Sequence, residues 1–199
     1  SIPTLGASGF GYQVARQFGH SVLPTRAGLV PFTITEPQLK TLCSELSGTS
    51  VEDCLVSCNG QSFRENILFT HRGLSGPAVL QASSYWTEGA PITVNLLPDS
   101  DLLAKLRSQR QTYGRRNLTT ELSHHLPARL VDHLSGIMDL GGNLADWSDA
   151  KLGTLIDRLS HWVMTPSGTE GYRTAEVTLG GIDTDALSSK TLEAKTRPG

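Results

Sequence analysis

Residues 50–70, SVEDCLVSCNGQSFRENILFT, contain two segments rich in branched and aromatic residues on either side of the dipeptide Asn59-Gly60. Asn-Gly is the dipeptide most typical of a two-residue β-hairpin, because both central residues of a type I′ turn need positive φ. Residues 50–58 and 62–70 are therefore predicted to pair as antiparallel strands. This hairpin indicates a fold built on an antiparallel sheet.

Similar segments extend the predicted sheet on both sides of the hairpin. They occupy residues 27–35, 91–97, 161–169 and 172–179, and each is rich in branched or aromatic residues. With the hairpin they make six strands. The simplest way to remove exposed strand edges is to close, or nearly close, these strands into a small antiparallel barrel.

Residues 99–160 separate the fourth predicted strand from the fifth and are predicted to form about four helices. Apolar residues recur there at helical spacing, as in Leu152, Leu155 and Leu159. Ser148 is expected to cap that last helix. The predicted fold class is therefore α+β, a small six-stranded antiparallel barrel with an inserted helical array.

The charge balance gives no sign of a nucleic-acid or membrane partner. Lys and Arg number 17 against 19 Asp and Glu, so the formal net charge is −2 and the chain has no overall basic field. No apolar run approaches the roughly eighteen residues of a membrane-spanning helix, and the sequence does not begin like a secretion signal. We therefore expect a globular cytoplasmic protein with no nucleic-acid partner and no membrane partner.

The cysteines and histidines do not form a metal-binding pattern. Cys43, Cys54 and Cys58 are too few for a disulfide framework, which favours a reducing compartment, and no second Cys or His pair completes a zinc site. His124 and His125 are adjacent, so on a helix they point about 100° apart and cannot chelate from one face. We predict no metal and interpret the cysteines as small buried hydrophobic residues.

The stretch GASGFG is the first candidate ligand site. Gly6, Gly9 and Gly11 precede a plausible amphipathic helix, but their order differs from the dinucleotide fingerprint, and no strand precedes them. Glycines allow a ligand to approach the backbone closely, and a tight turn into the helix is the alternative explanation.

Two further stretches could also contact a ligand. In FTHRGLSGPAVLQ, His71 and Arg72 lie just before a predicted helix start, where free N–H groups attract anions; a surface corner is the alternative. Thr178, Gly180 and Gly181 lie at a predicted strand end, where a flat ring could approach or the chain could simply turn.

The stretch KLRSQRQTYGRR, residues 105–116, carries five cations and one tyrosine. This composition could form a nucleic-acid or phosphate patch. We interpret it instead as a solvated helical face, because the rest of the chain offers no basic groove.

Three of these stretches occur together in an order that resembles a known family. PTLGASGFGYQVARQFGHSVLPTRAGLVPFT, LFTHRGLSGPAVLQASSYW and AEVTLGGIDTDALSSKTLEAKTRPG resemble the bacterial flavoproteins called aminoacetone-oxidase-like or BaiN-like NAD(P)/FAD-dependent oxidoreductases. The resemblance covers essentially the whole chain. In that family a Rossmann-like FAD domain is interrupted by an insert made of a six-stranded barrel and a helical array.

The resemblance implies a domain organisation and a set of site residues. The parts would be crossings to an FAD domain at 1–25 and 180–199, a barrel at 26–98 and 161–179, and a helical subdomain at 99–160. The site residues would be Gly6, Gly9, Gly11, Thr178, Gly180 and Gly181 for the flavin, and His71 and Arg72 for a small-molecule substrate.

The function implied by the resemblance is the substrate-covering insert of an oxidoreductase that passes hydride through FAD. FAD would be bound by the full-length parent, with its missing FAD-binding domain as the partner, and the chain alone would be inactive and flavin-free. The alternative is an autonomous module that binds a small ligand or a protein without any redox role. A third hypothesis, nucleic-acid binding through residues 105–116, predicts salt-dependent binding.

Overall fold

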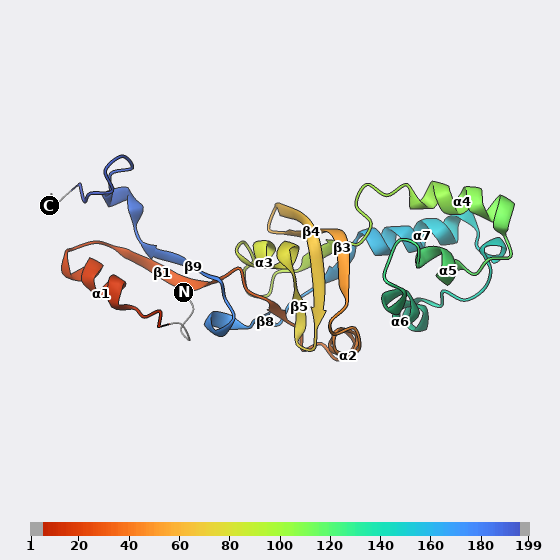
Figure 1. Cartoon of the computed structure of the whole chain (residues 1–199), viewed down its shortest axis with the longest axis horizontal. Coiled ribbons are helices and arrows are strands. Elements are labelled where there is room, and N and C mark those ends of the chain that lie inside the picture. The colour runs from red at the N-terminus through yellow and green to blue at the C-terminus, as the bar shows by residue number, and fades with distance from the viewer. Residues whose placement is uncertain (1–5, 196–199) are drawn as a thin grey trace. The chain divides into compact units, whose positions relative to one another are not determined.

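The computed structural model describes residues 6–195 and divides the chain into two compact units. The first unit contains the described residues up to Val30 and those from Glu170 onward, and the second is Pro31–Thr169 (Figure 1). The contiguous hydrophobic core lies in the second unit, from Phe32 to Met164. Each unit is described separately.

The first unit is a two-stranded ribbon with a helix packed against it. Its elements are α1 (Phe10–Gln17), β1 (Val22–Gly28), the 3-10 turn η3 (Gly171–Arg173), β9 (Val177–Ile182) and the 3-10 turn η4 (Thr184–Ala186). β1 and β9 pair antiparallel, with Val22 opposite Ile182 and Gly28 opposite Val177. α1 contacts both strands, so the two ends of the unit are joined through the ribbon.

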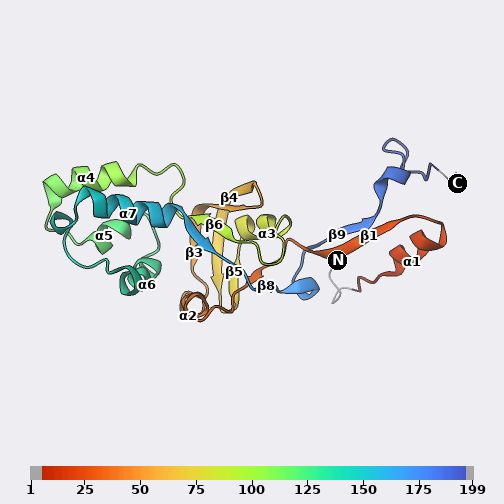
Figure 2. The same ribbon diagram turned by 180° about the vertical axis from the view of Figure 1, so that it is seen from behind.

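The second unit is built on a seven-stranded antiparallel sheet. Its strands are β2 (Phe32–Thr33), β3 (Ser50–Cys58), β4 (Gln61–Thr70), β5 (Gly73–Ser75), β6 (Ile92–Asn95), β7 (Trp162–Met164) and β8 (Gly168–Thr169). Their spatial order is β7-β6-β3-β4-β5-β2-β8. Figures 1 and 2 show the sheet from opposite sides. Helices α2 (Pro37–Glu45) and α3 (Pro77–Ser83) pack against β4 and β5.

The central β3–β4 hairpin confirms the prediction from Asn-Gly. Cys58 pairs with Gln61 across the turn, and Asn59 and Gly60 have φ of +46° and +77°. These values suit the type I′ turn, whose twist matches that of the strands. The hairpin forms the longest ladder of the sheet.

The sheet curls but does not close among the residues that the structure describes. β7 and β8 stand at opposite edges and are not paired with each other. Only three residues separate Met164 from Gly168, so the two edges can be at most about 14 Å apart at this point. The predicted barrel is therefore found as a strongly curved open sheet.

The α+β fold class is confirmed, and the strand assignments differ in detail. Segment 27–35 divides between β1 and β2, because Leu29 has φ of +46° and Pro31 follows soon after. Segment 161–169 divides into β7 and β8. Segment 172–179 supplies β9, which pairs with β1 rather than with the large sheet. Strand composition identifies extended segments but not their partners.

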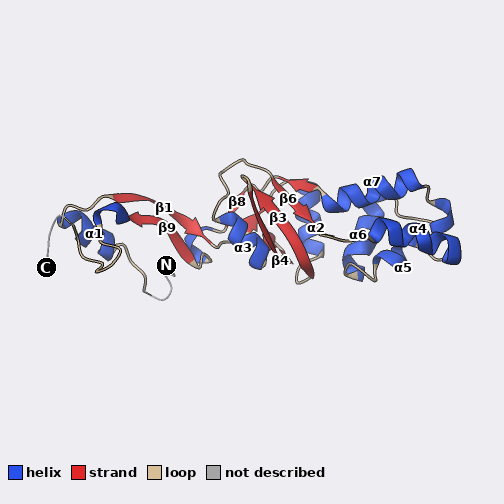
Figure 3. Ribbon diagram, turned by 90° about the horizontal axis from the view of Figure 1, so that it is seen from above, coloured by secondary structure: helices blue, strands red, loops and turns tan. Residues whose placement is uncertain are grey.

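The helical array lies between β6 and β7, as predicted. It consists of α4 (Leu102–Tyr113), α5 (Leu118–Leu122), α6 (Ala128–Met138), the 3-10 turn η2 (Leu144–Asp146) and α7 (Asp149–Ser160), which gather together in Figure 3. Ser148 caps α7, since its hydroxyl accepts a hydrogen bond from the Lys151 N–H at 3.3 Å. The predicted apolar face of α7 is buried.

β6 and β7 are neighbours in the sheet, with Thr93 opposite Val163. The whole helical array is therefore topologically the loop of a β-hairpin. Its packing nevertheless continues the core of the sheet, because buried leucines of α4 to α7 belong to the same hydrophobic cluster.

We expect the three thiols to resist alkylation in the folded protein. Burial raises the pKa of Cys43 to about 11 and that of Cys54 to about 12, and it raises the pKa of Cys58 as well. The thiolate is the reactive form. Iodoacetamide labelling read by mass spectrometry, with and without denaturant, measures this protection, and fast labelling of the native protein would contradict it.

The same shifts predict a loss of stability at alkaline pH. Unfolded thiols ionise near a pKa of about 8.5, so the unfolded state loses these protons before the folded state does. The stabilisation is complete below that pH and falls as the pH rises toward the folded values. Denaturant titrations at several pH values check the sign.

Candidate functional site

The structure brings two of the predicted flavin contacts to one pocket of the first unit. Gly9 is the N-cap of α1, and Thr178 lies on β9 opposite Ala27. Both line a pocket of about 200 Å³, together with Tyr12 and Tyr172. The two ends of the unit therefore meet at a small concave site.

The glycines of GASGFG have open space beside them. A Cβ built on Gly6, Gly9 or Gly11 would meet no atom within 4 Å among the described residues. Gly6 has φ of +88°, which favours glycine, but Gly9 and Gly11 have no such backbone requirement. Packing among residues 6–195 thus gives no reason for glycine at these two positions, and there is room for a ligand.

Gly180 and Gly181 have a clear role inside the ribbon. A Cβ on Gly180 would lie 2.1 Å from the carbonyl oxygen of Pro24, and one on Gly181 would lie 3.2 Å from the Tyr12 ring. Both residues have positive φ. The close approach of β9 to β1 and α1 accounts for glycine here without a ligand.

A second pocket of the first unit is mainly apolar. It has a volume of about 600 Å³, and its lining includes Gly11, Phe18, Ile182 and Leu192. The last three side chains are large, apolar and exposed. Gly11 therefore belongs to a different hollow from Gly9.

His71 and Arg72 occupy the two-residue turn between β4 and β5 in the second unit, and both are exposed. The Arg72 carbonyl accepts a hydrogen bond from the Ile34 N–H at 2.8 Å, which fixes the turn to the chain near β2. The predicted helix start follows at Pro77, but α3 has only seven residues. The turn presents two basic side chains on a well-anchored backbone.

Three of the five cations in residues 105–116 are engaged within the protein. Arg107 and Arg110 pair with the Asp149 carboxylate at 3.5 and 2.6 Å. Arg116 pairs with the buried Glu121 at 3.1 Å, and its guanidinium lies 4.0 Å from the centre of the Tyr113 ring. These contacts tie α4 to α5 and α7, which supports the interpretation as a helical face.

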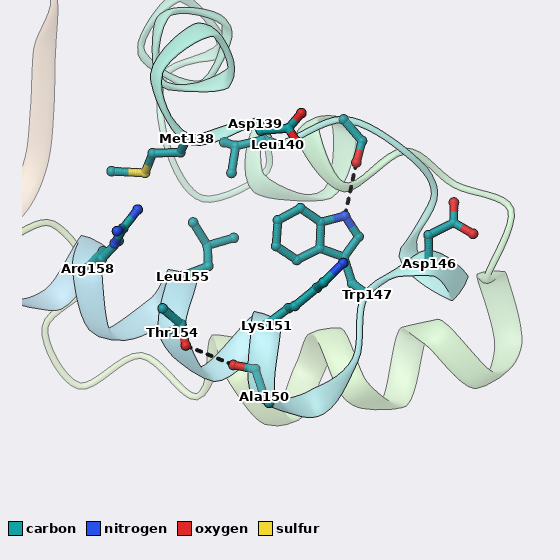
Figure 4. A pocket seen from close by; sticks show the side chains of 11 residues that line it. Met138, Asp139, Leu140, Asp146, Trp147, Ala150, Lys151, Thr154, Leu155 and Arg158 are labelled. Carbon is teal, nitrogen blue, oxygen red and sulfur yellow. Dashed lines mark hydrogen bonds between the residues drawn. The ribbon is translucent and has the colours of Figure 1, made fainter.

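Sequence reasoning missed a pocket in the helical array. It has a volume of about 470 Å³ and lies between the end of α6, η2 and α7 (Figure 4). Its lining includes Trp147, Lys151 and Arg158. An aromatic residue followed by cations at helical spacing was the available signal, but the hollow exists only because the end of α6 and the segment after it lie beside α7.

The indole of Trp147 is held in place by hydrogen bonds. Its Nε1 donates to the Gly141 carbonyl at 3.1 Å, and its own carbonyl accepts from Arg110 Nη1 at 2.6 Å. The side chain is partly exposed at the pocket. The pocket thus contains a fixed aromatic surface with Lys151 beside it and Arg158 at the other end, near Met138 (Figure 4).

The exposed residues His124 and His125 lie in the turn between α5 and α6. Burial is the main cause that lowers the pKa of His125, with smaller contributions from Lys105 and His124. Among residues 6–195, no group of three or more His, Cys, Asp or Glu side chains could hold a metal ion. Within the same residues, no helix combines the length and apolarity needed to cross a membrane.

The chain matches a family model over most of its length. Residues 26–177 match the model described as HI0933-like protein barrel and H2TH domain. The match therefore includes the curved sheet and the whole helical array.

Curated relatives match the entire chain. It is 53% identical over 204 residues to the ribosomal RNA dihydrouridine synthase of Escherichia coli K12, covering 100% of this chain and 50% of that protein. It is 44% identical over 196 residues to the enzyme of the same name from Haemophilus influenzae, covering 98% and 48%. A 3-dehydro-bile acid delta(4,6)-reductase of Clostridium scindens is 23% identical over 98% of this chain and 51% of that protein. The chain spans about half the length of the relatives it matches.

The relatives correct the predicted partners. Two of them are named for ribosomal RNA, which contradicts the expectation of a small-molecule substrate and no nucleic acid. The net charge of −2 averages over the whole chain, whereas contacts to RNA need only a local group of cations and rings. The likeness to BaiN-like reductases holds only at lower identity.

Proposed function

The chain belongs to the HI0933-like barrel and H2TH domain family, and from this premise we propose that it is the barrel-and-helix part of a flavin-dependent oxidoreductase that reduces uridine in ribosomal RNA. The observation that carries the proposal is the 53% identity, over the whole chain, to a protein named ribosomal RNA dihydrouridine synthase. Because that match spans half of the relative, the activity proposed is that of the full-length protein to which this chain contributes.

FAD is the cofactor proposed for that protein. When bound, it would take a hydride from NAD(P)H and deliver it to uridine, whose C5–C6 double bond becomes single once a proton is also added. The open space beside Gly9 and Gly11 and the pocket shared by Gly9 and Thr178 support a flavin-facing role for the first unit. That pocket is small, so it would contact only a portion of the cofactor.

The apolar surface of the first unit supports contact with the rest of an FAD domain. Phe10, Phe18 and Leu192 are 69%, 51% and 79% exposed. Burying large apolar side chains against further protein is favourable. We propose that the remaining part of the full-length protein covers this surface.

The second unit would hold the RNA. His71 and Arg72 are proposed as contacts to the RNA backbone, since exposed basic side chains on an anchored turn suit phosphate oxygens. A cytoplasmic location is proposed with this substrate. That the 199-residue chain alone retains no flavin stays a prediction. It is checked by measuring flavin absorbance after FAD has been added and the unbound flavin removed.

The test is reduction of uridine by the full-length protein. Ribosomal RNA from cells that lack its gene is incubated with the protein, FAD and NADPH or NADH, and dihydrouridine is measured in nucleoside digests by mass spectrometry. We expect dihydrouridine to form together with an equal amount of oxidised nicotinamide. Gly9→Val is expected to lower flavin content strongly without lowering the melting temperature of the flavin-free protein, because no described atom lies near its Cβ position.

The matched control is Gly136→Val on α6, another position where a Cβ meets no described atom within 4 Å. This variant should retain its flavin. A full-length protein that is folded but binds no flavin and forms no dihydrouridine would contradict the proposal and favour an autonomous binding module.

A further inference from the structure

We propose that the pocket formed by Trp147, Lys151 and Arg158 binds single-stranded RNA, with a base stacked on the indole and the adjoining phosphates on the two cations. This inference rests on the proposed function for the choice of RNA as the ligand. The proposed RNA-binding site lies on the helical array.

Trp147 offers a rigid aromatic surface. Trp147 follows η2 and is fixed by hydrogen bonds at its Nε1 and at its carbonyl. Figure 4 shows its ring between the segment of Asp139 and Leu140 and the side chain of Lys151. A ring that is already ordered loses little conformational entropy when a base stacks on it.

The two cations of the pocket lie on the same helix. Lys151 and Arg158 are seven residues apart on α7, so they lie on one side of the helix about 10 Å apart along its axis. Both are exposed and line the same pocket. Because both side chains are long and flexible, they can reach phosphates of the same extended strand.

Lys151 and Arg158 form no ion pair among the described residues, so their charges are available to a ligand. The ion pairs of the described helical array use Arg107, Arg110, Arg116, His133 and His161, and they leave Lys151 and Arg158 out. Three of the five cations in residues 105–116 are therefore committed to the fold. Those at the pocket retain their charge for a ligand.

The carboxylates at the pocket determine how the RNA is oriented in it. Asp146 already accepts a hydrogen bond from the Asn143 N–H at 2.9 Å, and Asp139 lies on the other side of the indole from Lys151 (Figure 4). Carboxylates repel phosphate but accept from amino and hydroxyl groups. The RNA backbone is therefore placed along α7, with a base or ribose hydroxyl toward Asp139.

The pocket volume of about 470 Å³ falls within the range of about 300–1,000 Å³ that is usual for small-ligand sites. It is large enough for a nucleotide. The cavity, the ring and the cations together form one site for a segment of RNA.

The test measures RNA binding separately from uridine reduction. A fluorescein-labelled, uridine-rich single-stranded RNA oligonucleotide is titrated with the full-length protein, and its anisotropy is followed at several salt concentrations. Trp147→Ala should weaken binding about tenfold, and Trp147→Phe should retain most of it. Lys151→Gln with Arg158→Gln should weaken binding and flatten the slope of log affinity against log salt by roughly 1.4.

The charge control is Lys40→Gln, which removes an exposed cation on α2 and should change neither affinity nor slope. Lys151 and Arg158 are exposed, so their variants remain informative if Trp147→Ala fails to fold. Affinity and salt slope unchanged in all pocket variants would overturn the inference, as would equal binding of a double-stranded probe.

The same variants distinguish this inference from the proposed function. If the protein forms dihydrouridine and the pocket variants act like wild type, the pocket inference is wrong and the proposed function stands. If the variants lose RNA binding but the wild type forms no dihydrouridine, the site stands and the proposed reaction is wrong.

Discussion

Gly180→Ala is expected to destroy the β1–β9 ribbon while leaving the second unit folded. The new Cβ would lie 2.1 Å from the Pro24 carbonyl oxygen and 3.0 Å from its carbonyl carbon. These are backbone atoms, so no side-chain rotation relieves the contact. Alanine must also adopt a φ of +78°. Strain and overlap together should lower the stability of the first unit by about 3 kcal/mol.

Hydrogen exchange read by mass spectrometry measures this loss locally. Amides of β1 and β9 should lose protection in the variant, whereas those of the β3–β4 hairpin should keep it. Gly171→Ala is the matched control, because Gly171 has φ of +70° in the same unit and a Cβ there meets nothing within 4 Å. Its cost should be about 1 kcal/mol, from backbone strain alone. Similar exchange in both variants would contradict the role of the Pro24 contact.

Arg116→Ala is expected to destabilise the helical array by about 2 kcal/mol. Its Nη1 pairs with Glu121, whose side chain is 1% exposed, so the variant leaves a buried carboxylate without its cation. The Arg116 side chain is 48% exposed, and water entering its place will solvate part of the charge, which keeps the loss below the usual cost for a fully buried pair. The stacking on Tyr113 is lost as well.

Denaturant unfolding followed by far-ultraviolet circular dichroism measures this effect. Arg115→Ala removes the neighbouring exposed cation and should change stability by less than about 0.5 kcal/mol. Adding Glu121→Gln to Arg116→Ala should restore part of the loss, because the neutral amide is cheaper to bury. Equal stability of the Arg115 and Arg116 variants would show that the pair does not hold α4 to α5.

The sequence was most informative where structure depends on local chemistry. Asn59-Gly60 predicted the hairpin because its turn needs positive φ, and Ser148 predicted the start of α7 because a hydroxyl caps free N–H groups. Segment 172–179 was correctly seen as extended in part, but its partner β1 lies about 150 residues away in the chain. No local pattern specifies such a pairing.

The candidate site shows the same limit. Gly9 and Thr178 were both singled out, yet only the ribbon and α1 bring them into one pocket. Trp147 and Lys151 were overlooked because a hollow is made by packing between helices and not by any residue type. Nucleic acid was excluded from net charge, which reports nothing of where individual cations are paired.

The hairpin position of the helical array has an evolutionary consequence. Since β6 and β7 remain neighbours whatever chain connects them, the array can be lengthened, reshaped or exchanged while the strand order of the curved sheet is preserved. Changes at the surface of this insertion therefore leave the strand order intact, whereas its buried leucines must be kept because they continue the core of the sheet. Two relatives that match this chain are named for different substrates, ribosomal RNA and a bile acid.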